Sequence, residues 1–235
     1  MEFRISDSFT SSLAKLTSDE QKAVKTTAFD LQMNPENPGF SFHKLDRAQD
    51  KNFWSVRVNR DIRVIVHRSK SSLLLCYVAH HDDAYKWAER RKLETHPKTG
   101  AAQLVEIRER VEEVRVPVYV TVEAEQPPKP LLFNKFDDDA LLGFGVPSEW
   151  LTDVKNANED SILELADHLP AEASEALIEI AVGGTPKPSV TVSPEANPFE
   201  HPDAQRRFRI MTNQDELERA LDFPWEKWTV FLHPD

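Results

Sequence analysis

The sequence predicts an α+β fold, in which helices pack on a mainly antiparallel sheet. Three observations lead to this prediction. Residues 53–66 alternate apolar with polar side chains, which is typical of strands that have one buried face. Residues 73–79 form a continuous apolar run, as expected for a strand covered on both faces. Apolar residues at helical spacing flank this region on both sides, at 8–31 and 82–93.

The N-terminal elements follow in order. Residues 2–5 are predicted to form a short strand, and residues 8–16 a short helix. Thr17 and Glu20 have the spacing of a capping box, which starts a second helix by satisfying two free backbone N–H groups. That helix must end before residues 34–39, where two prolines and a glycine occur.

The strand region then contains two predicted turns, at 59–61 and 69–72. Along it, Ser55 and Arg57 lie on the face opposite to the apolar residues, and the next strand places Arg63 in the equivalent way. The last strand ends at His80 and His81, and residues 82–93 are predicted to continue as a helix. Ionisable groups at a strand end, next to an arginine-bearing face, predict a functional site there.

Charge is unevenly distributed along the chain. The net charge is −11, but residues 1–94 carry +3 and the remainder −14, which indicates a basic module with an acidic extension. One cysteine, Cys76, excludes an internal disulfide and a cysteine-rich metal site. The sequence shows no signal peptide and no long apolar segment, so we expect a cytoplasmic protein without a membrane partner.

Residues 1–95 resemble the RelE/ParE toxin superfamily. The resemblance rests on the paired N-terminal helices and on four sequence stretches, which are Lys44-Leu45, residues 54–58 (WSVRV), residues 62–66 (IRVIV) and residues 78–81 (VAHH). It implies an antiparallel sheet with two N-terminal helices and a C-terminal helix. The superfamily includes ribosome-dependent mRNA endonucleases, gyrase poisons and inert relatives on one scaffold.

The resemblance also implies site residues. In RNA-cleaving members, strand residues at the places of Ser55, Arg57 and Arg63 hold the scissile phosphate, although Ser55 replaces the usual second basic group. The strand end supplies an acid and a base-stacking aromatic. The implied catalytic set is Arg57, Arg63, His80, His81 and Tyr85, and further contacts to nucleic acid are predicted for Lys44, Arg47, Lys51, Arg60, Arg68 and Trp87. No metal and no cofactor are predicted.

Simpler interpretations exist for the same residues. Arg57 and Arg63 could serve solubility on an exposed strand face, paired with Asp46, Asp50 or Asp61. Residues 80–83 could serve simply to cap the following helix, without any role in chemistry. A metal site formed by His80, His81 and Asp83 is a third alternative, for which the sequence offers no matching ligands elsewhere.

The acidic part of the chain is predicted to contain four segments. Residues 96–130 form a helix (104–113), a strand (115–122) and a proline-rich linker, and residues 131–183 form a helical region with an internal repeat. In the repeat, residues 138–150 are echoed by 159–173, each with an acidic start, an apolar helix and a proline that opens a second helix. Its acidity favours a protein partner. Residues 184–209 are a second linker, and 210–235 begin a further domain.

The tail at 223–235, together with the features above, resembles the leader of bacterial UvrD/Rep-type helicases. No G-x-x-x-x-G-K-[ST] motif occurs in the chain, so the chain itself has no such ATP site. Three functions remain open. The first is a nucleic-acid- or ribosome-facing module, with RNA or DNA as partner, at the front of a helicase-type protein. The second is an active mRNA interferase restrained by its acidic half, which would mask the Arg57/Arg63 face. The third is a catalytically inert protein-interaction module.

Overall fold

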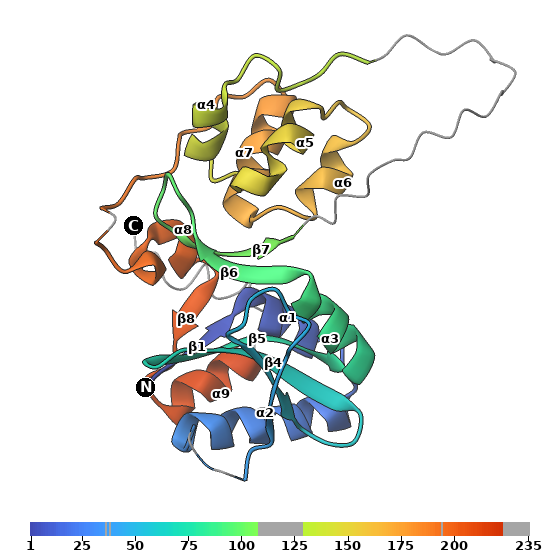
Figure 1. Ribbon diagram of the computed structural model, residues 1–235, viewed down its shortest axis with the longest axis vertical. Coiled ribbons are helices and arrows are strands. Elements are labelled where there is room, and N and C mark those ends of the chain that lie inside the picture. The colour runs from blue at the N-terminus through green and yellow to red at the C-terminus, as the bar shows by residue number, and fades with distance from the viewer. Residues whose placement is uncertain (36, 38, 108–128, 194, 223–235) are drawn as a thin grey trace, which may run out of the picture.

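The computed structural model describes residues 1–35, 37, 39–107, 129–193 and 195–222. A unit built around a six-stranded sheet occupies the lower half of Figure 1, and a helical unit occupies the upper half. A two-stranded hairpin lies between them. The predicted α+β class is confirmed, and we refer to the two parts below as the sheet unit and the helical unit.

The sheet unit comprises the elements β1 (Glu2–Ser6), α1 (Asp7–Leu13), α2 (Ser18–Met33), β2 (Phe42–Lys44), β3 (Phe53–Arg57), β4 (Ile62–Arg68), β5 (Ser72–His80), α3 (His81–Glu89), β8 (Phe208–Ile210) and α9 (Gln214–Asp222). The hairpin consists of β6 (Arg91–Thr95) and β7 (Ala102–Glu106). The helical unit and its return to the sheet contain α4 (Asp138–Gly143), η1 (Ser148–Trp150), α5 (Leu151–Lys155), α6 (Ile162–Ala166), α7 (Ala171–Ala181), η2 (Pro198–Glu200) and α8 (Pro202–Gln205).

The sheet has the strand order β2-β3-β4-β5-β1-β8 and is mixed. All neighbours are antiparallel except β1 and β5, which run parallel, so the predicted antiparallel sheet is confirmed only in part. Alternation of side chains predicts that a segment is a strand, but it does not reveal the direction of the neighbouring strand.

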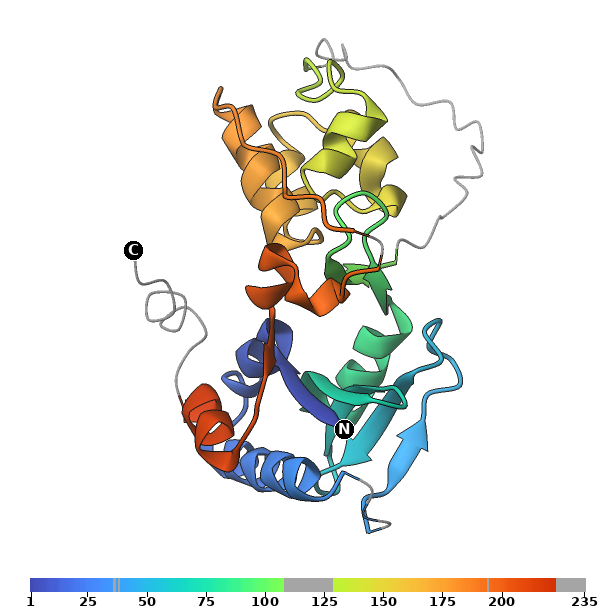
Figure 2. The same ribbon diagram turned by 90° about the vertical axis from the view of Figure 1, so that its left-hand side faces the viewer.

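Each face of the sheet has its own core. On one face, Val56, Val64 and Leu75 pack against α1, α2 and α9. On the other face, Phe53 and Ile65 pack against α3 and the hairpin. The predicted capping box forms at the start of α2, and Figure 2 shows α2 and α9 side by side beneath the sheet.

Residues 208 and 209 were expected at the end of a linker and residues 210–222 at the start of a further domain, but they belong to the sheet unit. β8 pairs with β1 at the edge of the sheet. The amphipathic helix α9 buries Leu217, Ala220 and Leu221 in the core that α2 also lines. The apolar spacing within α9 predicts a helix, and tertiary packing decides which surface it covers. The predicted boundary at 210 therefore falls inside β8, and residues 223–235 lie outside the described residues.

The helix predicted for 104–113 is wrong where the structure describes it. Residues 102–106 form β7, which pairs with β6, and the first three residues of β6 (91–93) were expected to end the 82–93 helix. Gln103 and Val105 point to the helical unit, whereas Ala102 and Leu104 join the core beneath α3. A strand buried on both faces loses the polar alternation that would reveal it. The remainder of that helix and the strand predicted for 115–122 lie outside the described residues.

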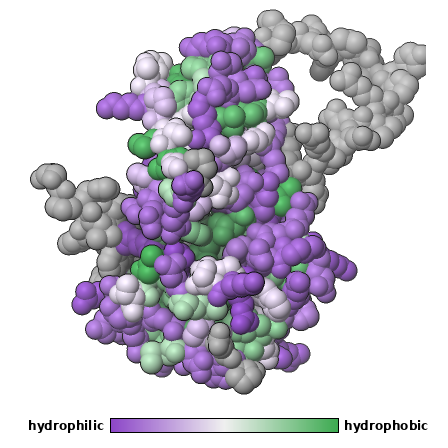
Figure 3. Space-filling model, turned by 60° about the vertical axis from the view of Figure 1, so that its left-hand side comes forward, coloured by the Kyte–Doolittle hydropathy of each residue, from purple (hydrophilic) through white to green (hydrophobic). Residues whose placement is uncertain are grey.

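The helical unit follows the predicted repeat. In each copy a short helix (α4 or α6) is followed by a proline, Pro147 or Pro170, and then by a second helical segment. Its core contains Phe133, Leu141 and Leu177. None of the helices within the described ranges has the length and hydrophobicity needed to cross a membrane. On the face drawn in Figure 3, hydrophobic residues form small groups among hydrophilic ones.

Candidate nucleic-acid interface

Arg57 and Arg63 lie directly opposite each other on β3 and β4. Their side chains turn toward the loop that joins the two strands. The Nε of Arg57 donates a hydrogen bond to the carbonyl oxygen of Asn59 (3.1 Å), and Nη1 of Arg63 donates to the same oxygen (2.9 Å). Nη1 of Arg63 also donates to the carbonyl oxygen of Ile62 (2.9 Å). One carbonyl oxygen thus brings two permanently charged guanidinium groups together, with further N–H donors still available.

No carboxylate neutralises this pair within the described part of the chain. Asp50, one of the proposed partners, accepts hydrogen bonds from backbone N–H groups and lies 3.4 Å from Nε2 of His67. Burial acts to raise the pKa of the Asp50 carboxyl, but the hydrogen bonds from His67 and from backbone N–H groups outweigh it, so the pKa is lowered. Neither arginine has an ion pair with Asp46 or Asp61 among the described residues. The solubility interpretation based on ion pairs therefore finds no support in the geometry.

The two histidines at the end of β5 diverge, as alternation along the strand predicts. Nε2 of His80 lies 3.5 Å from Oε1 of Glu20, at the start of α2. His81 lies on the other side of α3, where its ring stacks on Tyr85 with 4.4 Å between the ring centroids. The proposed metal site from His80, His81 and Asp83 is not assembled, and no cluster of three or more potential ligands occurs in the described ranges.

His81 is oriented by its neighbour in the chain. Its Nδ1 lies 2.8 Å from Oδ1 of Asp82, and the hydrogen bond from His81 lowers the pKa of Asp82. Because an ionised carboxylate only accepts, this contact places the imidazole proton on Nδ1. The other ring nitrogen, Nε2, is then left as a proton acceptor.

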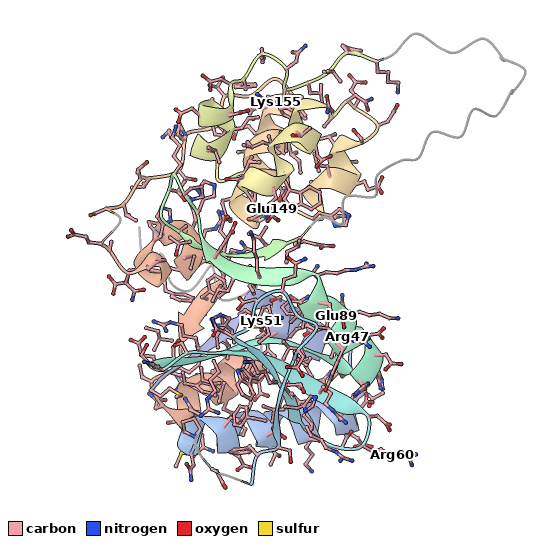
Figure 4. All side chains as sticks on the ribbon, viewed as in Figure 1. Arg47, Lys51, Arg60, Glu89, Glu149 and Lys155 are labelled. Carbon is pink, nitrogen blue, oxygen red and sulfur yellow. The ribbon has the colours of Figure 1, made fainter. Side chains whose placement is uncertain are left out.

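A groove of about 480 Å³ runs between α3 and the loop that follows β2. The groove is lined by His43, Lys44, Leu45, Asp46, Arg47, Ala48, His81, Asp82, Tyr85, Lys86 and Glu89. The ring of Tyr85 lies at its base, since its hydroxyl is 3.1 Å from Oγ of Ser55 on the Arg57/Arg63 face. Figure 4 shows Arg47 and Glu89 beside each other at this groove, and Arg60 at the outer end of the sheet unit.

The groove also contains His43 and Lys86, which were not among the site residues predicted from the sequence. The centroid of the His43 ring lies 6.4 Å from that of Tyr85, with an interplanar angle of 29°. Lys86 lines the same groove one helical turn beyond Asp82. The signal for Lys86 is its helical spacing from Asp82, which places both on one face of α3.

The other predicted contact residues do not all share this surface. Lys44 is exposed, and its Nζ lies 5.9 Å from the centre of the Trp54 ring. Arg68 points to the opposite face of the sheet, where its guanidinium lies 4.8 Å from the Phe42 ring. Lys51 donates to two backbone carbonyl groups of the loop, at Asp46 and Ala48.

Trp87, predicted to contact nucleic acid, is instead a core residue. Its indole is 9% exposed and stacks on Tyr77, with 4.7 Å between centroids and an interplanar angle of 3°. The guanidinium of Arg91 covers it at 5.0 Å. Apolar neighbours at helical spacing, Ala84 and Ala88, turn this side chain inward.

The described part of the helical unit does not cover Arg57 or Arg63. It contacts the hairpin through Lys92 and Glu149 (2.7 Å) and through the pair of Lys98 with Asp139. Figure 4 shows Lys155 of this unit at the opposite end of the molecule from Arg60.

The chain matches no known protein family, no curated protein and no solved structure.

Proposed function

We propose that the sheet unit is a nucleic-acid-binding module that holds the phosphodiester backbone of single-stranded RNA on Arg57 and Arg63. The observation that carries this proposal is the shared hydrogen bonding of both guanidinium groups to the carbonyl of Asn59, without a carboxylate partner in the described residues. Two like charges held together repel each other, and a phosphate placed between them removes that repulsion. Guanidinium groups bind phosphate through paired N–H donors, which adds geometric specificity.

The neighbouring groove supports a single strand rather than a duplex. The rings of Tyr85 and His81 offer a stacking surface beside the arginines, and such surfaces need unstacked bases. Lys44 and Arg47 line the same groove and could follow the strand's backbone. This proposal fits the RelE/ParE resemblance and a role as the leading module of a UvrD/Rep-type helicase protein. Ribosomal RNA or DNA would present the same phosphodiester backbone and are alternative ligands.

Replacing Arg63 with glutamine is expected to weaken RNA binding about tenfold, because it removes a charge-assisted hydrogen bond to phosphate. The measurement is fluorescence anisotropy of the 1–235 chain with a labelled single-stranded RNA, titrated between about 50 and 200 mM salt. The plot of log affinity against log salt should become shallower by about 0.7 for each phosphate that the variant no longer neutralises. Arg57→Gln is expected to act in the same direction.

Arg68→Gln is the matched control, because it removes the same charge from the same strand but on the opposite face. It should leave both affinity and salt dependence close to those of the unchanged chain. Equal losses of affinity in Arg63→Gln and Arg68→Gln would mean that RNA responds to net charge alone, and the assigned site would be abandoned. Absence of RNA binding even at low salt would favour the inert interaction module.

RNA cleavage is a second candidate, and the contact between His81 and Asp82 favours it. With Nδ1 held by Asp82, Nε2 of His81 could accept the proton of a ribose 2′-OH as that oxygen attacks the adjacent phosphorus. The bond to the 5′-oxygen would break and that oxygen would take a proton from water, leaving a 2′,3′-cyclic phosphate and a 5′-hydroxyl. Gel analysis of the RNA recovered from the titration tests this directly. Products that persist in His81→Ala would exclude this histidine as the base.

A further inference from the structure

The junction between the two units combines apolar packing with several polar contacts. Val105 of β7 contributes an apolar side chain to the core of the helical unit. Beside it, Nε2 of the fully buried Gln103 donates to Oε1 of Glu172 (2.7 Å) and to the carbonyl oxygen of Gly145 (3.1 Å). Polar contacts that can be re-formed with water make a docked arrangement reversible more readily than a large apolar core does.

His96 occupies a central place in this junction. It is 1% exposed and lies in the turn of the hairpin, between β6 and β7. Its Nδ1 faces the backbone N–H groups of Thr99 (3.1 Å) and Lys98 (3.3 Å), and therefore accepts from them. Its Nε2 lies 3.0 Å from the carbonyl oxygen of Val146 in the helical unit, and therefore donates. Both contacts together require the neutral imidazole with the proton on Nε2.

The segment that follows α7 and leads back to β8, which we call the strap, is also held by a buried histidine. The backbone N–H of Val192 donates to the carbonyl oxygen of Thr99 (3.1 Å), which ties the strap to the hairpin turn. His201, also 1% exposed, has Nε2 2.6 Å from the carbonyl oxygen of Val190, and its Nδ1 accepts from the N–H of Asp203 (3.1 Å). Two buried imidazoles therefore hold neighbouring parts of one junction.

The charges that face His96 come from three elements. Burial lowers the pKa of His96, and nearby His201 lowers it further, while the carbonyl of Val146 and the carboxylates of Glu94 and Asp203 act in the opposite direction. The ammonium group of Lys98, in the same turn, pairs with Asp139 of the helical unit. The net effect favours the neutral ring in the docked arrangement.

We propose that this junction is an acid-sensitive hinge, in which protonation of His96 releases the helical unit from the hairpin. A proton on Nδ1 would face the N–H groups of Thr99 and Lys98, so the hairpin turn could no longer hold the ring in its present position. The ring would then no longer point at Val146, and the hydrogen bond that joins the hairpin to the helical unit would break. The inference is independent of RNA binding.

The direction of the pH dependence follows from the lowered pKa of His96. Docking is fully stable above the ordinary pKa of about 6.5, where the ring is neutral in both arrangements. As the pH falls below that value, the undocked arrangement takes up the proton first. Between the two pKa values, the docking constant should fall by up to about tenfold for each pH unit.

Energy transfer between two dyes on the 1–235 chain tests the hinge. The dyes are attached through Lys70→Cys in the sheet unit and Glu159→Cys in the helical unit, both at exposed positions, while the native Cys76 is buried. Transfer should fall reversibly from about pH 7.5 to about pH 5.5. In His96→Gln, whose amide can still donate to Val146 but does not titrate, transfer should be independent of pH.

His43→Gln is the matched control, since this exposed histidine lies on β2 of the sheet unit, where its ring faces Tyr85 of α3 and not the helical unit. It should show the same transition as the unchanged chain. A pH-independent signal in the unchanged chain, or an unaltered transition in His96→Gln, would overturn the proposal. If His96→Gln is undocked at every pH, NMR titration of the unchanged chain decides. The His96 ring should then change from the Nε2–H tautomer with a midpoint below 6.5 that coincides with the fall in transfer, and a higher midpoint would reject the hinge.

Discussion

Leu217→Ala is expected to lower the free energy of unfolding of the sheet unit by about 3 kcal/mol. Leu217 is 0% exposed and packs in the same core as Val24, Ala28 and Leu31 of α2. Removing its side chain removes apolar burial and leaves a cavity between two helices that both cover one face of the sheet. Urea denaturation monitored by circular dichroism measures the change.

Leu163→Ala is the matched control for this prediction. Leu163 is 67% exposed on α6, so the same deletion there should change stability by less than about 0.5 kcal/mol. Equal effects at the two positions would mean that α9 does not belong to the sheet unit in solution.

The same packing predicts that a fragment ending at residue 95 is unstable, because it lacks α9, β7 and β8 and exposes the surface of α2 that α9 covers.

How far the sequence predicts the fold depends on whether the decisive contacts are local. The capping box at Thr17 and Glu20 and the alternation around Val64 are local patterns, and the structure contains both. The positions of β8 and α9 depend on contacts with β1 and α2, about two hundred positions earlier in the chain, which no local pattern records. The segment of β7 was predicted as a helix, because Leu104 and Val105 are buried on opposite faces and the strand therefore shows no polar alternation.

The candidate site divides in the same way. Period-two alternation correctly predicted that Arg57 and Arg63 share a face and that His80 and His81 diverge. Arg68 was also among the predicted nucleic-acid contacts, but it lies on the other face of β4 from the arginines of the site. Trp87 was assigned to the surface by resemblance, whereas its neighbours on α3 turn it into the core.

Arg207→Met is expected to lower the free energy of unfolding by about 3 kcal/mol near neutral pH, because it leaves a buried carboxylate without its counter-charge. The side chain of Arg207 is 11% exposed, and its Nη1 lies 3.8 Å from Oε1 of Glu172, which is 6% exposed. Its Nε lies 3.8 Å from Oδ2 of Asp7, which is 30% exposed and therefore partly screened by water. We therefore expect Glu172 to account for most of the destabilisation, because methionine replaces the length of arginine but not its charge.

The pH dependence distinguishes this charge effect from a packing effect. Burial raises the pKa of Glu172 and Arg207 opposes that rise, so removing the arginine raises the pKa further. The folded variant then binds more protons than the unfolded chain at pH values above the ordinary pKa of 4.5, and its stability should recover as the pH falls toward that value. Arg206→Met is the control, since Arg206 pairs with Glu175 at the surface and should cost about 1 kcal/mol or less. A deficit in Arg207→Met that stays constant from neutral to acidic pH would show that Arg207 acts through packing and not by neutralising Glu172.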